Sequence, residues 1–220
     1  MRNVRTVIFR DRTHAGQMLA EAILAEHPSL SSESPLVLAI PRGGVPVGLE
    51  VAKALDAPLD VIIARKLGAP GHEELGIGAV VSGGGRVLDQ ETIEALDVSD
   101  EYLDSVTRRE EAELARRMHR FRGDRPPPEI AGRSVVLVDD GLATGVTARA
   151  ALRALRAQHP RRLIFAAPVC SLEGASQLAE DADSLVCVAI PEEFHGVGAW
   201  YGDFAQLSDE EVVRMLEGRD

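Results

Sequence analysis

Short apolar runs alternate with segments of helical periodicity along most of this chain, and this alternation constrains its fold more than any other feature. Wholly apolar runs of about four to eight residues are typical of strands buried on both faces of a sheet. Amphipathic helices between such strands favour right-handed βαβ units and a mainly parallel sheet. We therefore expect an α/β fold that binds ligands beyond the carboxyl ends of its strands. The predicted strands cover residues 36–40, 59–64, 135–138, 163–167 and 185–190.

Helix boundaries are marked by capping residues and by breaks in the apolar pattern. Asp11 is expected to cap a first helix that ends at His27. A second helix is expected after Gly44, and another at about 144–158. The polar residues 29–35 are predicted as a loop.

One stretch breaks the alternation of strands and helices. Apolar pairs flank the glycine-rich residues 82–86, a pattern typical of a hairpin turn. A long, highly charged helix is expected from a cap at Ser99 to Phe121. We interpret residues 82–133 as an insertion, either a solvent-exposed excursion or a lid or dimer arm near a binding site. The chain as a whole, residues 1–220, is expected to be a single domain.

The composition limits the classes of function that this chain could have. Its formal net charge is −11, which disfavours a nucleic-acid partner because phosphate backbones are bound by basic surfaces. No apolar run approaches the ~20 residues that span a membrane, so no membrane association is expected. Cys170 and Cys187 lie in separate apolar runs and are interpreted as buried thiols. Together with the lack of a signal-peptide pattern, these thiols predict a cytoplasmic protein.

The loop after the strand predicted at 135–138 carries most of the chemical information. Asp139 and Asp140 come first, and small residues and threonines that open a helix follow. Backbone N–H groups at such a helix N-terminus bind phosphate without a lysine, and the hydroxyls of Thr144 and Thr147 can donate to the same phosphate. The two carboxylates suit the vicinal diol of a sugar, so a sugar phosphate would satisfy both halves of the loop. The glycine patterns of Walker and dinucleotide-binding loops are absent.

The segment VVLVDDGLATGVT, residues 135–147, resembles the thirteen-residue signature with which type I phosphoribosyltransferases bind phosphoribosyl pyrophosphate (PRPP). The resemblance implies the type I phosphoribosyltransferase fold, a twisted, mainly parallel sheet flanked by helices, with a small hood. Two positions depart from the family pattern, because Gly141 replaces a branched apolar residue and Val146 stands where glycine, lysine or arginine is common. Neither change removes a backbone donor. The implied PRPP-binding residues of this loop are Gly141, Leu142, Ala143, Thr144, Gly145, Val146 and Thr147.

Two further segments resemble the pyrophosphate-binding parts of the same family. The segment Pro-Arg-Gly-Gly matches the family's first loop, which implies that Arg42, Gly43 and Gly44 hold pyrophosphate. The resemblance also implies a cis peptide bond before Arg42. Arg65 and Lys66 resemble the basic pair of adenine-type members, whose side chains also face pyrophosphate.

The C-terminal residues 191–220 resemble the hood of purine-type members, in which an aromatic side chain stacks on the base. Phe194 and Trp200 are the candidates for this stacking. A packed corner of the core is an equally good interpretation of the aromatic cluster at Trp200. Ala143 stands where members that act on 6-oxopurines carry an aspartate, so the acceptor base stays open.

The resemblance implies a Mg²⁺-dependent enzyme that transfers the 5-phosphoribosyl group of PRPP to a nitrogenous base, forming a nucleoside monophosphate and pyrophosphate. Arg42, Arg65 and Lys66 would stabilise the departing pyrophosphate. Asp139 and Asp140 would fix the ribose diol, directly or through metal-bound water. Mg²⁺ would be held mainly by PRPP, since this ion keeps several waters and needs few protein ligands. A homodimer is expected.

Two other functions could use the same loop. A regulatory protein on this fold could bind PRPP or a nucleotide without turnover, but the retained basic residues favour leaving-group chemistry. A Mg²⁺-dependent phosphatase built on Asp139 and Asp140 is a weaker alternative, because the threonine-rich phosphate loop would then have no purpose. Pyrophosphate release from PRPP distinguishes the transferase from the regulatory protein.

Overall fold

The computed structural model describes residues 9–83 and 85–218. Five parallel strands form its central sheet, in the order β2-β1-β6-β7-β8. The predicted α/β fold with a mainly parallel sheet is thereby confirmed. The strands are β1 (Leu36–Ala39), β2 (Leu59–Val61), β6 (Ser134–Val138), β7 (Arg162–Val169) and β8 (Ser184–Ala189).

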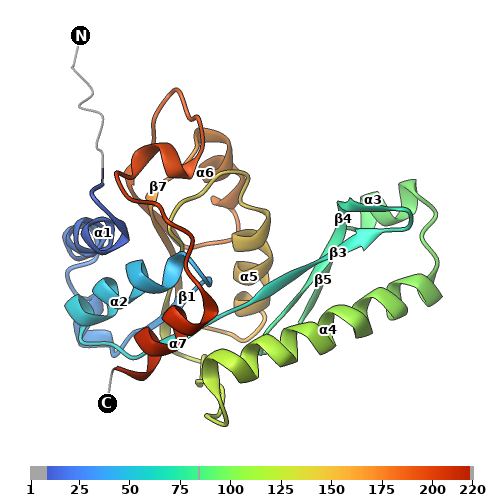
Figure 1. The fold of residues 1–220 in the computed structure, drawn as a ribbon, viewed down its shortest axis with the longest axis horizontal. Helices are drawn as coiled ribbons and strands as arrows, with labels where there is room; N and C mark the ends of the chain where they lie inside the picture. Colours follow the sequence, from blue (N-terminus) through green and yellow to red (C-terminus); the bar gives the residue numbers. More distant parts are fainter. Residues whose placement is uncertain (1–8, 84, 219–220) are drawn as a thin grey trace.

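Helices cover both faces of this sheet (Figure 1): α1 (Arg12–Glu26) and α2 (Gly44–Leu55) on one face, α5 (Val146–Arg156) and α6 (Leu172–Leu178) on the other. Because side chains alternate along a strand, neighbouring residues of the central strand β6 enter different cores. Val136 lies in the core beneath α1 and α2, and Leu137 lies in the core beneath α5 and α6. The strand is therefore apolar throughout, as a strand covered on both faces must be.

The first helix begins and ends where the sequence predicts. Oδ1 of Asp11 accepts a hydrogen bond from the N–H of His14 at 2.8 Å, which satisfies one of the donors that a helix N-terminus leaves unpaired. The helix ends at the predicted boundary, with His27 as its C-cap. The predicted loop 29–35 contains a single turn of 3-10 helix, η1 (Leu30–Glu33).

A second sheet of three antiparallel strands follows β2, in the order β3-β4-β5. The pairing of β4 with β5 confirms the hairpin predicted around residues 82–86. The strands are β3 (Ala64–Ala69), β4 (His72–Val81) and β5 (Arg86–Leu88).

The strand predicted at 59–64 was too long, because the chain changes sheets within it. β2 ends before Ile62, the N–H of Ile63 donates to Oγ of Ser82 at 3.0 Å, and β3 starts at Ala64. Ile62 and Ile63 are both buried, so the apolar run continues across the change of sheet and hides it in the sequence. As a result, the basic pair that follows lies inside β3 and not beyond a parallel strand.

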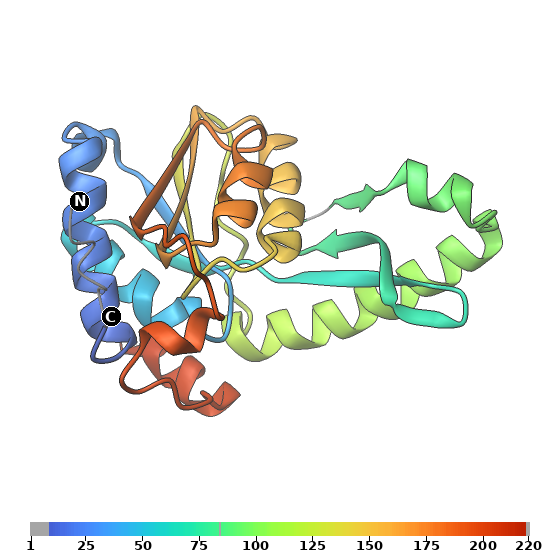
Figure 2. The same cartoon turned by 90° about the horizontal axis from the view of Figure 1, so that it is seen from above.

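Residues 64–83 and 85–122 project from the parallel sheet as an arm, which contains the second sheet, α3 (Gln90–Ala95) and α4 (Asp100–Arg122) (Figure 2). α4 is the predicted long, charged helix, and Oγ of Ser99 caps it. The departure from the parallel sheet begins near residue 64, ahead of the start at 82 expected from the sequence. The arm has a small core of its own, formed by Leu67, Ala69, Ile77, Val80, Ile93, Val98, Leu103 and Val106.

The elements beyond β8 form the hood, which contains η2 (Val197–Trp200) and α7 (Asp209–Glu217). Backbone hydrogen bonds join it to the start of the described chain. The N–H of Phe9 donates to the carbonyl oxygen of Trp200, and the N–H of Gly202 donates to that of Phe9, both at 2.7 Å. α7 packs against α2 and α4, so the hood also contacts the base of the arm.

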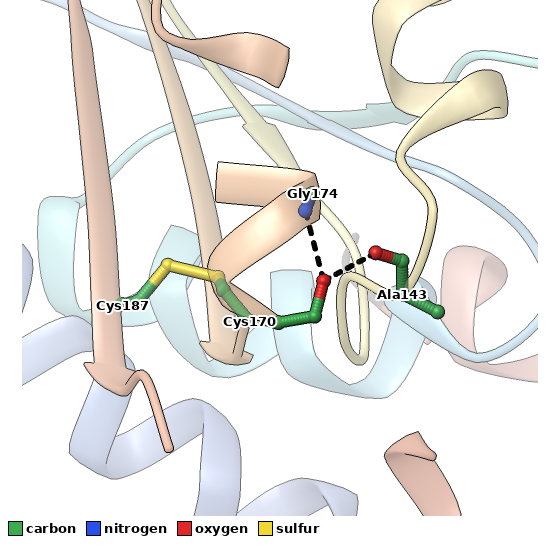
Figure 3. The surroundings of a disulfide bond; sticks show 5 residues. Ala143, Cys170, Gly174 and Cys187 are labelled. Carbon is green, nitrogen blue, oxygen red and sulfur yellow. Dashed lines mark hydrogen bonds between the residues drawn. A yellow bond between two sulfur atoms is a disulfide. The ribbon is translucent and has the colours of Figure 1, made fainter. Parts of the chain in front are cut away.

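Cys170 and Cys187 form a disulfide bond, so the interpretation of both as buried thiols was wrong (Figure 3). Cys170 lies just beyond the end of β7, and Cys187 lies on β8, the parallel neighbour of β7. Their Cα atoms are 6.2 Å apart, a separation that a disulfide spans. The cysteines are 17 residues apart in different apolar runs, and only the pairing of the two strands brings them together.

The disulfide removes one of the two arguments for a cytoplasmic location, which stays a prediction. Within residues 9–83 and 85–218, no helix is long and apolar enough to cross a membrane.

Candidate functional site

The loop between β6 and α5 forms the centre of the candidate site. Gly145 has a φ of 74°, a left-handed conformation that favours glycine and lets the chain turn sharply into α5. Leu142 is buried beneath the loop, whereas Thr144 and Thr147 are exposed. The first N–H groups of α5 have no partner within the helix, since every helix leaves its first donors unpaired. The loop thus offers hydroxyl and N–H donors to a ligand, as the sequence predicts.

Ser171, which lies just beyond β7, holds this loop in place through hydrogen bonds. Its Oγ donates to the carbonyl oxygen of Ala143 at 2.5 Å and accepts from the N–H of Gly174 at 2.9 Å (Figure 3). Its N–H donates to the carbonyl oxygen of Leu142 at 2.7 Å. A Cβ on Gly174 would lie 2.4 Å from the Ala143 oxygen, so α6 packs directly against the loop. Because Cys170 directly precedes Ser171, the disulfide connects the backbone next to Ser171 to β8.

Asp139 and Asp140 lie side by side at the end of β6, and both are partly buried. Oδ1 of Asp139 accepts a hydrogen bond from the N–H of Asp140, and Oδ2 of Asp140 accepts one from Nε of Arg12, both at 2.8 Å. Burial raises the pKa of both carboxyl groups, and the charge of Asp140 raises the pKa of Asp139 further. The hydrogen bond from Arg12 opposes this rise in the pKa of Asp140. The site therefore contains two adjacent acids, one of which has a cation beside it.

Arg12 connects the acid pair to the hood, and sequence reasoning missed it. Its guanidinium carbon lies 3.9 Å from the ring centroid of Phe204, and Nη1 donates to the carbonyl oxygen of Ala205 at 2.9 Å. The hydroxyl of Tyr201 donates to the backbone carbonyl of Asp140 at 2.5 Å, which adds a second link from the hood. An arginine at the start of a helix carries no sequence signal for this role, since its partners lie 128 and 193 residues further along the chain.

The family's first loop packs against the acid pair. The peptide bond that precedes Arg42 is cis, which confirms the prediction. A Cβ on Gly43 would lie 1.9 Å from Oδ2 of Asp140, and one on Gly44 would lie 2.7 Å from the carbonyl oxygen of Val138. Both positions therefore require glycine, since a side chain would push the two loops apart. The structure brings together the two loops that the sequence singles out.

A cavity of about 320 Å³ lies between the first loop, α4 and α7. Arg42 and Thr147 line it, so each of the two loops contributes one predicted residue to the same opening. Arg117 and Phe121 of α4 line it as well, and sequence reasoning did not select them. A charged helix gives no local signal that separates a residue at a cavity from one in solvent.

Arg65 and Lys66 lie in β3 of the arm and are not among the residues that line this cavity. Nε and Nη2 of Arg65 donate to Oε2 of Glu110, at 2.9 and 2.6 Å, and Glu110 is a buried residue of α4. The stem of Lys66 passes Gly76, where a Cβ would lie 3.3 Å from its Cδ. The expectation that this pair follows a parallel strand was wrong, because β3 belongs to the hairpin. Contact of the pair with pyrophosphate stays a prediction.

Trp200 is buried in the hood, in one cluster with Phe9. The residue is 9 % exposed, and this burial favours the packed corner as the interpretation of this tryptophan. Phe194 lies at the edge of the same cluster and is partly buried. Val197 fills the space beside Gly141, where a Cβ would lie 2.4 Å from Cγ1 of Val197. This contact explains why a branched residue is absent at that position of the loop.

A parallel sheet with a threonine-rich loop at the end of its central strand, two adjacent acids and a facing glycine loop defines the type I phosphoribosyltransferase fold. The sequence model of one family, the phosphoribosyl transferase domain, matches residues 11–201. This chain belongs to that family.

The relatives agree with this assignment. Two proteins of Mycobacterium tuberculosis, from strains CDC 1551 / Oshkosh and ATCC 25618 / H37Rv, bear the name "Putative phosphoribosyl transferase" and are 42 % identical over 210 residues. The match covers 96 % of this chain and 46 % of each relative, so the chain spans about half their length. The crystal structure of TT1426 from Thermus thermophilus has a TM-score of 0.84 and 43 % identity, over 95 % of this chain and 97 % of that one. A hypothetical protein from Neisseria gonorrhoeae with bound ppGpp shares the fold, with a TM-score of 0.53 and 15 % identity over 96 % of both chains.

Proposed function

We propose that this protein is a phosphoribosyltransferase that transfers the 5-phosphoribosyl group from PRPP to a nitrogenous base and releases pyrophosphate. The observation that supports it most is the close packing of the first loop on the acid pair, with Gly43 against Asp140. With this packing, donors for a phosphate, acceptors for a sugar diol and the cation of Arg42 occupy one small region. PRPP is a ligand that uses all three.

The phosphate loop is proposed to bind the 5′-phosphate of PRPP. The N–H groups of residues 143–147 and the hydroxyls of Thr144 and Thr147 donate to its oxygens. Asp139 and Asp140 each have a second carboxyl oxygen besides the one in the hydrogen bonds described above. These oxygens accept hydrogen bonds from the ribose diol.

Transfer begins when the lone pair of a base nitrogen attacks C1′ of the ribose. The C–N bond forms with inversion as the C1′–O bond breaks, and the electrons of the broken bond leave on pyrophosphate. An acceptor that carries a proton on the attacking nitrogen releases it to water. The guanidinium of Arg42 stabilises the negative charge that develops there, and Arg65 and Lys66 are candidates for the same role. Because this charge is larger in the transition state than in bound PRPP, loss of Arg42 should lower kcat more than PRPP affinity.

Asp139 and Asp140 fit a Mg²⁺ ion, because this ion prefers oxygen ligands and is usually held by one or two carboxylates together with substrate phosphates. In the part of the chain that the structure describes, no group of three or more His, Cys, Asp and Glu side chains could hold a metal. PRPP and water would therefore supply most of the ligands. When bound, the ion neutralises charge on the leaving pyrophosphate.

Phe194 is the remaining aromatic candidate for stacking on the acceptor base, since Trp200 is buried. Ala143 does not identify the base, so the proposal covers purines, pyrimidines and amines. We also propose that the protein is a homodimer and that it is located in the cytoplasm.

Pyrophosphate release from PRPP and Mg²⁺ across a panel of such acceptors tests the function. We expect release with at least one acceptor, and a fall in kcat of about tenfold or more, ~1.4 kcal/mol, for Arg42→Ala. Tight PRPP binding without release for any acceptor would instead favour the alternative, a regulatory protein that binds PRPP or a nucleotide without turnover.

Calorimetry tests the assignment of the phosphate loop separately. Thr144→Val removes one proposed hydroxyl donor, and we expect PRPP affinity to fall by about tenfold. Thr13→Val changes an exposed threonine of α1 and serves as the control. Unchanged affinity in both Thr144→Val and the Asp139→Asn/Asp140→Asn double variant would refute PRPP binding at this loop.

A further inference from the structure

Helix α4 closes one side of the cavity that Arg42 and Thr147 line. It reaches the cavity with Arg117 and Phe121, which are four residues apart and therefore lie on one face of the helix. We propose that Arg117 is a further contact residue for the pyrophosphate group of PRPP, so that the arm supplies part of the leaving-group site. This inference rests on the function proposed above, and it assigns a role to a helix in the segment that the family resemblance leaves unmatched.

The cavity has the chemistry of an anion site. Arg42 and Arg117 bring two guanidinium groups from separate elements, and Thr147, assigned above to the 5′-phosphate, lies on the side of the cavity that adjoins the phosphate loop. Asp209 supplies the one carboxylate among the lining residues. Guanidinium groups bind phosphate oxygens through paired, directed hydrogen bonds, and the two arginine side chains stay 47 % and 45 % exposed, open to such a ligand.

The base of α4 is fixed to the sheet, so Arg117 is held at the cavity in advance of binding. Nη2 of Arg122 lies 3.0 Å from Oδ2 of Asp60 and donates to the carbonyl oxygen of Val61 at 3.3 Å. Phe121 is 5 % exposed and packs into the core beneath α1 and α2. A cation placed on a rigid element loses little free energy to reorganisation when the ligand arrives.

The charges around Arg117 leave it available to an anion. Arg116 binds both oxygens of Glu113, at 2.9 and 2.8 Å, while Nε of Arg117 reaches Oε1 of the same carboxylate at 3.1 Å. The hydrogen bond from Arg116 lowers the pKa of Glu113 to about 2, so this group is a carboxylate at neutral pH. The guanidinium groups of Arg116 and Arg117 thus share the single negative charge of Glu113. This sharing leaves one positive charge in excess beside the cavity.

Pyrophosphate must displace Asp209 from its contact with Arg42. Nη1 of Arg42 lies 3.5 Å from one oxygen of Asp209, and Nη1 of Arg120 lies 3.4 Å from the other. Such long, partly exposed ion pairs contribute little to stability, because water screens them. Pyrophosphate carries several negative charges, so it competes well with a single carboxylate for Arg42.

Measuring the binding of three probes distinguishes a defect at the pyrophosphate-binding site from a defect at the phosphate loop. Calorimetry with Mg²⁺ measures the affinity for PRPP, for inorganic pyrophosphate and for ribose 5-phosphate, which lacks the pyrophosphate group. We expect Arg117→Ala to weaken PRPP and pyrophosphate binding by about tenfold, which corresponds to ~1.4 kcal/mol, and to leave ribose 5-phosphate binding unchanged. Arg117→Lys keeps a cation and should recover part of the loss.

Arg108→Ala is the matched control. It removes the same charge from an exposed position of α4 that does not line the cavity, and it leaves the pairing of Arg116 and Arg117 with Glu113 intact. Equal affinities of Arg117→Ala and Arg108→Ala for PRPP and pyrophosphate, with wild-type protein binding PRPP, would overturn the inference and leave the proposed function standing. If wild-type protein binds pyrophosphate through Arg117 but not PRPP, the proposed function fails and the anion site remains. If it binds neither, both fail.

Discussion

Nε of Arg12 lies 2.8 Å from Oδ2 of Asp140, and this hydrogen bond joins the first helix to the phosphate loop across 128 residues of sequence. The two side chains are 12 % and 15 % exposed, so the ion pair is largely removed from water. Phe204 and Ala205 contact the same guanidinium, which ties the hood to the loop as well. Asp140, which the sequence predicts to bind the ribose, therefore also helps to join the first helix, the phosphate loop and the hood.

Replacing Arg12 with methionine removes the cation and keeps much of the apolar stem. We expect the free energy of unfolding to fall by about 1–3 kcal/mol, because Asp140 is left as a partly buried carboxylate without its cation. Arg12→Lys keeps a positive charge and should lose less. Urea unfolding at pH 7 measures both variants, and equal losses would show that the charge of Arg12 is not what stabilises the junction.

The raised pKa of Asp139 predicts a pH dependence of stability. Burial and the charge of Asp140 make this carboxyl group hold its proton more tightly in the folded protein than in the unfolded chain. Its contribution to stability is therefore complete at low pH and is lost as the pH rises through the folded pKa. Asp139→Asn stays neutral at every pH.

We expect wild-type protein to lose stability relative to Asp139→Asn as the pH rises from about 4, the ordinary pKa of aspartate, towards neutrality. Urea unfolding of both proteins at a series of pH values, without Mg²⁺ or ligand, measures this difference. Parallel stability curves for the two proteins would contradict the raised pKa.

Gly43→Ala tests the contact between the two loops. The new Cβ would lie 1.9 Å from Oδ2 of Asp140, so either the Asp140 side chain or one of the two loops must shift. We expect PRPP affinity to fall by about tenfold or more and stability by about 1–3 kcal/mol, as for other overpacked sites. In Gly218→Ala the nearest atom would be the Arg214 oxygen at 3.4 Å, an ordinary contact, so this exposed position is the control. Wild-type affinity in Gly43→Ala would mean that the loops are not held together by this contact.

The disulfide predicts a sensitivity to reductant. Cys170 and Cys187 close a loop with a sequence separation of 17, and their replacement by serine should lower the free energy of unfolding by about 3 kcal/mol. A reducing agent should lower the Tm of wild-type protein and leave that of the double serine variant unchanged. Thiol titration of wild-type protein unfolded without reductant provides the direct check, and two free thiols there would contradict the bond.

The sequence by itself determined the features whose signals are local. Apolar runs marked the parallel strands, Asp11 and Ser99 marked the starts of two helices, and the order of residues 135–147 marked the phosphate loop. Each of these signals lies within a few residues, because capping, strand periodicity and loop conformation are set by neighbours along the chain.

Only the tertiary structure decided which distant residues meet. The apolar run that predicted one strand at 59–64 contains a change of sheet, because both sheets bury apolar side chains and the run looks the same in either. Arg12 and Arg117 reach the site through helix packing, and the cysteines meet through strand pairing. Periodicity tells which face of a helix is charged, but whether that face meets solvent or a cavity depends on where the helix is anchored.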